Sequence, residues 1–89
     1  MNLPLAEKVA LVTGGARDIG RAVSLRLAEL GASVAVNYFD NPEQAKETVL
    51  TIVGGGGKAV AIQGDVTIPS SVDRLVAKAR EVIEQALAR

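Results

Sequence analysis

The chain has 89 residues, of which ten are basic, ten are acidic and 48% are hydrophobic. This length fits one small domain, and the balanced charge offers no basic surface that would favour DNA or RNA. The absence of cysteine and histidine excludes disulfides, thiolate or imidazole zinc sites and a Ser-His-Asp mechanism. Residues 1–7 lack the pattern of a signal peptide, and no apolar run approaches the roughly 20 residues of a membrane span, so we expect a cytoplasmic protein.

The first part of the sequence predicts a strand, a helix and a second strand. Residues 8–13 (KVALVT) form a nearly unbroken apolar run, which is typical of a strand buried on both faces. Apolar residues recur at helical spacing over 19–30, and Gly31 is expected to end this helix. Residues 33–38 (SVAVNY) predict the second strand. The expected inward face of the helix consists of Ile19, Ala22, Val23, Leu27 and Leu30.

The next part repeats the helix and strand. Asn41 precedes a proline, which predicts a capped helix over residues 42–53. The four glycines at 54–57 resemble a flexible linker, but no second domain fits on either side of them. We therefore interpret them as a helix C-cap and turn. Residues 58–63 (KAVAIQ) predict the third strand.

A last helix is expected to begin at a cap formed by Ser70 or Ser71 and to run to the end of the chain. Strands that alternate with helices favour parallel pairing and right-handed crossovers. We therefore predict an α/β fold that forms a single domain over residues 1–89. It is half of a doubly wound Rossmann fold, with three parallel strands in the order 3-2-1 and helices on both faces.

A glycine-rich segment, residues 13–20 (TGGARDIG), lies between the first strand and the first helix. Gly14 and Gly15 permit a tight turn, and Gly20 permits the helix to pack close to the sheet. The unpaired N–H groups and positive dipole at the start of the helix favour an anion such as phosphate. The alternative is a turn that only connects strand to helix, and spacing alone does not separate the two.

A Walker-type phosphate loop is a further alternative for this segment. Gly15 and Gly20 have the glycine spacing of that motif. However, Arg21 and Ala22 follow Gly20, where the motif requires a lysine and a hydroxyl residue to hold phosphate and magnesium. The Walker interpretation therefore fails.

The segment KVALVTGGARDIGRAVSLRLAELGASVAVNY resembles the N-terminus of short-chain dehydrogenases/reductases, especially those near ketoacyl-carrier-protein reductases and sugar dehydrogenases. Thr13, Gly14 and Gly20 match the family motif TGxxxGxG, and residues 63–67 (QGDVT) match the segment after the third strand. The similarity extends from about residue 5 to residue 80. It implies an NAD(P)-binding site, and it assigns contacts with the adenine ring to Asp65 and Val66.

Asp18 departs from the family pattern, because it replaces the middle glycine of TGxxxGxG. An aspartate at this point is a good N-cap, so we expect its carboxylate to accept from the N–H of Gly20 or Arg21. Those donors are among the ones that a pyrophosphate would use, and the carboxylate repels that anion. We therefore expect reduced affinity for the cofactor.

The end of the second strand bears on the choice between NADP and NAD. NAD-binding enzymes place an acid there to bind the ribose hydroxyls, but this chain has Asn37 and Tyr38, with Asp40 in a probable turn. By the resemblance, Arg17 occupies a position where NADP-preferring relatives carry a basic residue that meets the 2′-phosphate. NADP is therefore favoured over NAD as the cofactor. The full set of expected cofactor-binding residues is Gly14, Gly15, Arg17, Asp18, Ile19, Gly20, Asn37, Tyr38, Asp65 and Val66.

The family's catalytic residues are absent from these 89 residues. Its Asn-Asn-Ala-Gly segment is not found, nor is the Tyr-x-x-x-Lys pair that handles the proton. The only tyrosine, Tyr38, does not have a lysine four residues later. We therefore expect no catalytic residue and no metal site in this chain, and no enzymatic activity.

Three functions remain open from the sequence. The first is a half-domain that binds the adenosine-phosphate part of NAD(P) at most weakly. The second is an engineered or excised folding unit that associates with itself and binds no ligand. The third is the cofactor-binding half of an NADP-dependent reductase that a second chain completes. Because the edge of the strand at 8–13 is apolar and open, we expect a homodimer that pairs this strand about a two-fold axis.

Overall fold

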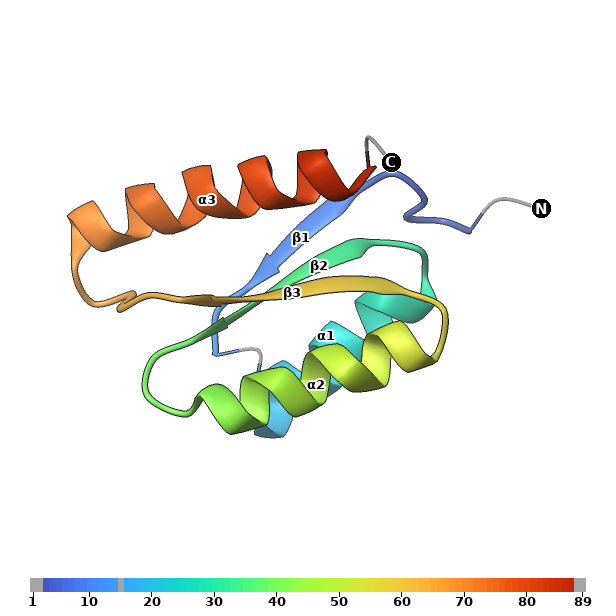
Figure 1. Ribbon diagram of the computed structural model, residues 1–89, viewed down its shortest axis with the longest axis horizontal. Coiled ribbons are helices and arrows are strands. Elements are labelled where there is room, and N and C mark those ends of the chain that lie inside the picture. Colours follow the sequence, from blue (N-terminus) through green and yellow to red (C-terminus); the bar gives the residue numbers. More distant parts are fainter. Residues whose placement is uncertain (1–2, 15, 88–89) are drawn as a thin grey trace.

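The computed structural model describes residues 3–14 and 16–87 and consists of three layers (Figure 1). A parallel three-stranded sheet lies between helix α3 on one face and helices α1 and α2 on the other. The elements are β1 (Val9–Val12), α1 (Asp18–Glu29), β2 (Ser33–Tyr38), α2 (Pro42–Gly54), β3 (Lys58–Gln63) and α3 (Pro69–Leu87). The predicted α/β fold, with alternating strands and helices on both faces, is confirmed.

The central strand of the sheet is β2. Val9 of β1 pairs with Ser33, and Val12 pairs with Val36. On its other side β2 pairs along its full length with β3, from Ser33 opposite Lys58 to Tyr38 opposite Gln63. The strand order β1-β2-β3 confirms the predicted order 3-2-1.

The alternation of side chains along β2 divides the core into two parts. Val34 and Val36 point to the face covered by α1 and α2, where they pack with Ala45 and Ile52 of α2. Ala35 points to the opposite face and packs with side chains of β3 and α3. Both parts use small aliphatic residues, as a sheet covered on both faces requires.

Helices α1 and α2 end in the same way. After each helix a glycine adopts a positive φ, at Gly31 (105°) and Gly56 (93°). The N–H groups of Gly56 and the next residue donate to the carbonyls of Val53 and Ile52, which is a Schellman cap. The interpretation of residues 54–57 as a helix end and turn is therefore confirmed.

The elements that differ from prediction do so at their ends. Strand β1 is shorter than residues 8–13 and is not buried on both faces, because Val9 lies at the sheet border and is 45% exposed. Helix α3 begins before both predicted serine caps. The carbonyl of Ile68 accepts from the N–H of Val72, and Pro69 takes the first helical position, where its missing N–H is harmless.

The predicted inward face of α1 is partly wrong. Ile19 and Val23 are exposed, by 81% and 42%, whereas Ser24 is completely buried. The helix is therefore rotated so that a small polar residue, rather than the first apolar ones, meets the sheet. In α2, helical spacing predicts Ala45, Val49, Ile52 and Val53 on the inward face, but Thr48 is buried there and Val53 is half exposed.

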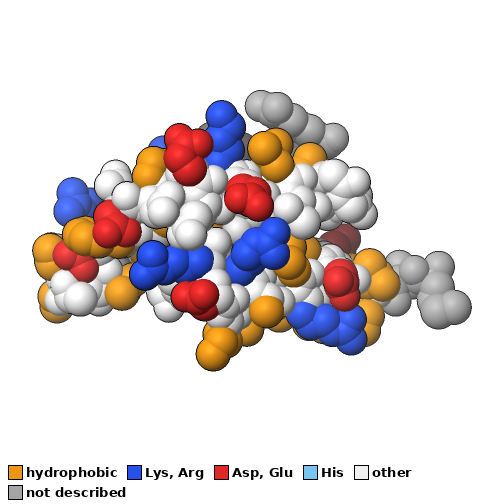
Figure 2. Space-filling model, turned by 90° about the horizontal axis from the view of Figure 1, so that it is seen from below, with side chains coloured by type: hydrophobic (Ala, Val, Ile, Leu, Met, Phe, Trp, Pro, Cys, Tyr) orange, Lys and Arg blue, Asp and Glu red, His pale blue; other side chains and the backbone are white. Residues whose placement is uncertain are grey.

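Basic and acidic side chains are interspersed on the face that carries α1 and α2, with isolated hydrophobic side chains between them (Figure 2). This mixture agrees with the formal net charge of zero. Among the described residues, no helix combines the length and the apolar character that spanning a bilayer requires.

Candidate functional site

The carboxyl ends of β1 and β2 open onto a hollow of about 310 Å³. In open α/β sheets, ligands bind outside the carboxyl ends of the strands. Four of the residues predicted to bind a cofactor meet here: Gly14, Arg17, Asn37 and Tyr38. The remaining lining residues are Ala16, Phe39, Asp40, Asn41 and Gln44.

Two described residues between the end of β1 and the first turn of α1 have a positive φ, Gly14 in the loop and Asp18 at the start of the helix. Gly14 has a φ of 62°, and a Cβ built on it would meet nothing within 4 Å, so conformation rather than space favours glycine there. Asp18 has a φ of 54°. The family motif TGxxxGxG places a glycine at this position, and the left-handed backbone supplies the reason. Aspartate is one of the few other residues that tolerate this conformation. Gly15 lies outside the described residues.

The prediction that Asp18 caps α1 is wrong. The N-cap is Arg17, which has an extended backbone (φ −149°) and whose carbonyl accepts from the N–H of Arg21. Asp18 is one residue too late to cap, since it is already the first helical residue. Arg17 itself makes no side-chain capping hydrogen bond. The start of α1 therefore presents backbone donors that no capping side chain occupies.

The other predicted residues of α1 contribute less to the hollow. Ile19 is 81% exposed, and Gly20 is partly buried in the first turn of the helix. Neither lines the hollow.

Two buried polar side chains hold the loop: Thr48, which was not predicted as a site residue, and Asn37, which was predicted to bind the cofactor and here has a structural role as well. Thr48 is fully buried in α2, and its Oγ1 donates to the carbonyl of Ala16 at 3.0 Å. Asn37 is only 3% exposed, and its Oδ1 accepts from the N–H of Gly14 at 3.4 Å. The Nδ2 of Asn37 donates to the carbonyls of Ile62 (3.2 Å) and Gly64 (3.1 Å). Asn37 therefore links the end of β1 to the segment after β3.

Gln44, one of the residues that line the hollow, carries a buried polar atom without a partner in the described part of the chain. The Oε1 of Gln44 is buried and has no hydrogen-bond partner among the described residues. Gln44 lies in the first turn of α2, where its N–H is already bonded to the Oδ1 of Asn41, as predicted for that cap. Because this atom has almost no accessible surface, a ligand in the hollow can reach it only if the Gln44 side chain turns.

Asp65 lies in a separate hollow of about 500 Å³ between the end of β3 and α3, and Val66 follows it as a 45% exposed residue. Phe39 lines both hollows. The Oδ1 of Asp65 accepts from the N–H (2.9 Å) and the hydroxyl (2.6 Å) of Thr67. Both hydrogen bonds lower the pKa of the Asp65 carboxyl, and the bond from the Thr67 hydroxyl has the larger effect. The structure thus gives Asp65 a local role in the turn that leads to α3.

The charges around the first hollow are mixed. Arg17 and Asp40 both line it. The ion pair within the described part of the chain joins Arg26 to Glu29, so Arg17 is not engaged with Asp40. A free guanidinium beside backbone donors suits a phosphate group, whereas the Asp40 carboxylate suits ribose hydroxyls. The residues present therefore fit the adenosine-phosphate part of a dinucleotide.

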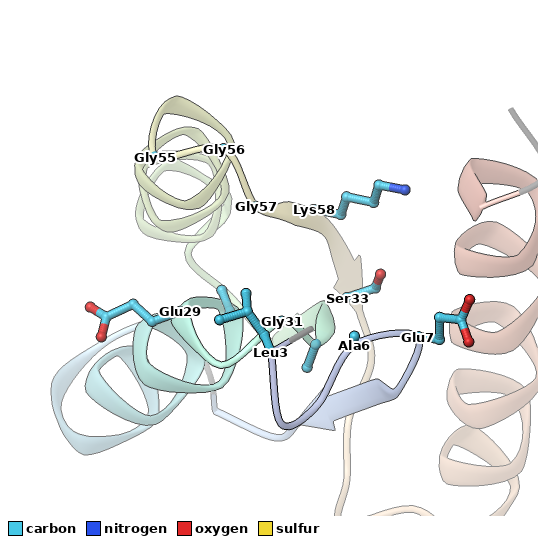
Figure 3. A pocket seen from close by; sticks show the side chains of 12 residues that line it. Leu3, Ala6, Glu7, Glu29, Gly31, Ser33, Gly55, Gly56, Gly57 and Lys58 are labelled. Carbon is cyan, nitrogen blue, oxygen red and sulfur yellow. The ribbon is translucent and has the colours of Figure 1, made fainter. Parts of the chain in front are cut away.

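A further hollow of about 440 Å³ lies at the opposite end of the sheet (Figure 3). It is framed by the turn around Leu3 and Ala6, by Gly31 and by the glycines that end α2. The side chains of Glu29 and Lys58 point away from it (Figure 3). No charged group converges on this hollow from the labelled residues, which distinguishes it from the hollow at the strand ends.

Known proteins are similar to this chain over most of its length. The family model described as short chain dehydrogenase matches residues 8–86. A hydroxynaphthalene reductase of Aspergillus fumigatus is 50% identical over 74 residues, which are 83% of this chain and 27% of that protein. A short-chain dehydrogenase/reductase homolog of Bacillus subtilis is 51% identical over 69 residues, 78% of this chain and 63% of that protein.

Solved structures show the same relationship. A dehydrogenase/reductase of Sinorhizobium meliloti superposes with a TM-score of 0.85 at 41% identity and covers 88% of this chain. A short chain dehydrogenase of Burkholderia cenocepacia, solved in complex with NADP, gives 0.83 at 44% identity over 88% of this chain. The chain corresponds to 31% and 32% of those two proteins. With a family model matched from residue 8 to residue 86, the chain belongs to the short-chain dehydrogenase family.

Proposed function

We propose that this chain binds the adenosine-phosphate part of NADP in the hollow at the ends of β1 and β2. The observation that carries the proposal is the convergence of Gly14, Arg17, Asn37 and Tyr38 on one hollow of about 310 Å³. The uncapped start of α1 supplies backbone donors, and its dipole favours an anion.

The preference for NADP over NAD rests on Arg17 and Tyr38. Arg17 lines the hollow and has no partner carboxylate among the described residues, so its guanidinium is available to a 2′-phosphate. Tyr38 occupies the last position of β2, where NAD-binding enzymes place an acid. The Burkholderia cenocepacia neighbour was solved with NADP, which supports the same choice. Asp18 and Asp40 oppose an anion, so the affinity is low.

We propose no hydride transfer by these 89 residues alone. They contain no Tyr-x-x-x-Lys pair, because Tyr38 is the only tyrosine and Pro42 follows it four residues later. The chain spans about 27% of the Aspergillus fumigatus reductase. Activity therefore requires a further polypeptide segment that supplies the proton-handling residues and the nicotinamide half of the site.

Calorimetric titration with 2′,5′-ADP, NADP, NAD, ADP and inorganic phosphate tests the proposed ligand. We expect 2′,5′-ADP and NADP to bind more tightly than ADP and NAD. Arg17→Gln, which keeps a polar side chain but removes the charge, is expected to abolish that difference and leave ADP binding nearly unchanged. An absence of heat or of NMR shifts at millimolar 2′,5′-ADP would refute the proposal.

A second copy of this chain is the partner that the sheet favours. Among the described residues β1 pairs only with β2, so its other edge has unpaired backbone groups. Val9 on this edge is 45% exposed. A strand edge of this kind associates with another strand, and two copies of β1 can pair antiparallel about a two-fold axis. The resulting sheet would have six strands.

A further inference from the structure

The loop that leads into α1 is supported by a hydroxyl group from the middle of α2. Thr48 is completely buried, and its Oγ1 lies 3.0 Å from the carbonyl oxygen of Ala16 and 3.0 Å from that of Gln44. Thr51, one turn later, makes the same local bond, to the carbonyl of Glu47 at 3.0 Å, but is exposed. The bond from Thr48 to Ala16 joins residues that are 32 positions apart. It is therefore a tertiary contact and not a requirement of the helix.

The contact fixes the direction of one peptide group. Ala16 is only 6% exposed, and its carbonyl points toward α2, where Thr48 is the donor. The structure has no cis peptide bonds among its described residues, and in a trans peptide the N–H points opposite to the carbonyl. The N–H of Arg17 therefore points away from Thr48, and Ala16 and Arg17, the two residues of this peptide group, both line the hollow.

We propose that Thr48 is a positioning residue, whose hydroxyl aims the N–H of Arg17 at a bound phosphate. The proposal rests on the proposed nucleotide-binding function and adds to it a residue that does not line the hollow. Asn37 secures the other end of the loop through the N–H of Gly14. Without the hydroxyl, the buried carbonyl of Ala16 loses its donor, and its peptide group is free to rotate toward solvent or another donor.

Three substitutions separate this role from general stability. Thr48→Val keeps the shape and the β-branch but removes the hydroxyl. Thr48→Ser keeps the hydroxyl and removes only the methyl group. Thr51→Val is the matched control, since it removes a threonine with the same local helix bond, and its contact outside α2 is with the guanidinium of Arg21 at 3.4 Å and not with a peptide group of the loop. Thr48→Ala, a better helix former, replaces Thr48→Val if that variant does not fold.

The first measurement is the affinity for 2′,5′-ADP, determined by calorimetry on fully folded protein. We expect Thr48→Val to bind about tenfold more weakly, in line with the loss of one buried hydrogen bond that is needed in the bound state. Thr48→Ser and Thr51→Val are expected to bind within about twofold of the parent protein. Equal affinity of the folded Thr48→Val and Thr51→Val variants would overturn the proposal.

The second measurement is the NMR order parameter of the Arg17 amide without ligand. A rigid amide gives about 0.85 and a flexible one less than about 0.6. We expect Arg17 to become flexible in Thr48→Val and to stay rigid in Thr48→Ser and Thr51→Val, while amides of β2 are unchanged. If the parent protein binds no nucleotide, the proposed function fails, yet this result still decides the positioning role. An Arg17 amide that is equally rigid in all variants would refute it.

Discussion

Replacing Asp18 by glycine restores the residue that the family motif has at this position, and the structure predicts what changes. Asp18 has a φ of 54°. A left-handed conformation costs a typical L-residue about 1–2 kcal/mol, and aspartate lies at the low end of that range. Glycine removes this strain but has more conformational entropy to lose, by roughly 0.5–1 kcal/mol. It also loses a favourable helix-dipole interaction of about 0.3–1 kcal/mol. The free energy of unfolding should therefore change by less than about 1 kcal/mol.

The affinity for an anion should change more than the stability. Asp18 is in the first turn of α1, beside the proposed phosphate position. Two unit charges about 6 Å apart in water interact by about 0.7 kcal/mol, so a phosphate dianion gains roughly 1.4 kcal/mol when the carboxylate is removed. That is about a tenfold increase in affinity. Asp18→Asn is the control that removes the charge but keeps a side chain that tolerates the left-handed backbone.

Calorimetric titration of 2′,5′-ADP at low and high salt, together with urea unfolding, tests this reasoning. Both variants should bind roughly 3–10 times more tightly than the parent chain at low salt, and the gain should shrink as salt screens the charge. If Asp18→Asn binds no better, the carboxylate does not face the anion. If Asp18→Gly is destabilised by more than about 2 kcal/mol, the side chain of Asp18 has a structural role that its backbone conformation does not reveal.

Three further predictions concern the turn after β3, the sheet edge and the end of α1. Thr67→Val removes the hydroxyl but keeps the N–H, so the pKa of Asp65 should rise part of the way to its ordinary value in an NMR titration, and an unchanged pKa would contradict the role of the hydroxyl. Because the folded pKa is lowered, the stabilisation from this contact is complete above the ordinary aspartate pKa and is lost as the pH falls through the lowered value. Val9→Lys on the β1 edge should shift a dimer to monomer in light scattering at high micromolar concentration, and a parent chain that is already monomeric there would refute the dimer. Gly31→Ala should lower the free energy of unfolding in urea by more than about 1 kcal/mol, because its Cβ would lie 2.9 Å from a side-chain carbon of Leu3 and its φ is positive. Gly54→Ala is the control, because a Cβ there would meet nothing within 4 Å. Equal stability of the two variants would contradict the clash.

The order and type of the elements follow from local patterns. The apolar run of β2, the Asn41 cap and the glycines that end both early helices are read within a few residues, so the sequence predicts them correctly. The motif around Gly14 also locates the hollow, because a parallel sheet places all such loops at one end.

The details that fail are those decided by contacts between distant residues. Hydropathy assigned Ile19 and Val23 to the buried face of α1, but Ser24 is the residue that is fully buried. Thr48 likewise looks polar in the pattern, although its hydroxyl is satisfied by a carbonyl 32 residues away. Asn37 stands out in the sequence as a polar residue at the end of an apolar strand, but its hydrogen bond to the segment after β3 does not follow from that pattern.

The position of β1 at the sheet border has a consequence for ligand binding. The proposed phosphate-binding loop leaves directly from β1, which is an edge strand and, among the described residues, has a hydrogen-bonded neighbour on one side only. Whatever pairs with the vacant side of this strand restricts its motion and thereby lowers the entropy that the loop must give up when it closes around an anion. By thermodynamic reciprocity, the anion must in turn strengthen the attachment of that neighbour by the same factor. Binding of an anion at the loop and pairing of another strand with β1 are thus expected to be thermodynamically coupled.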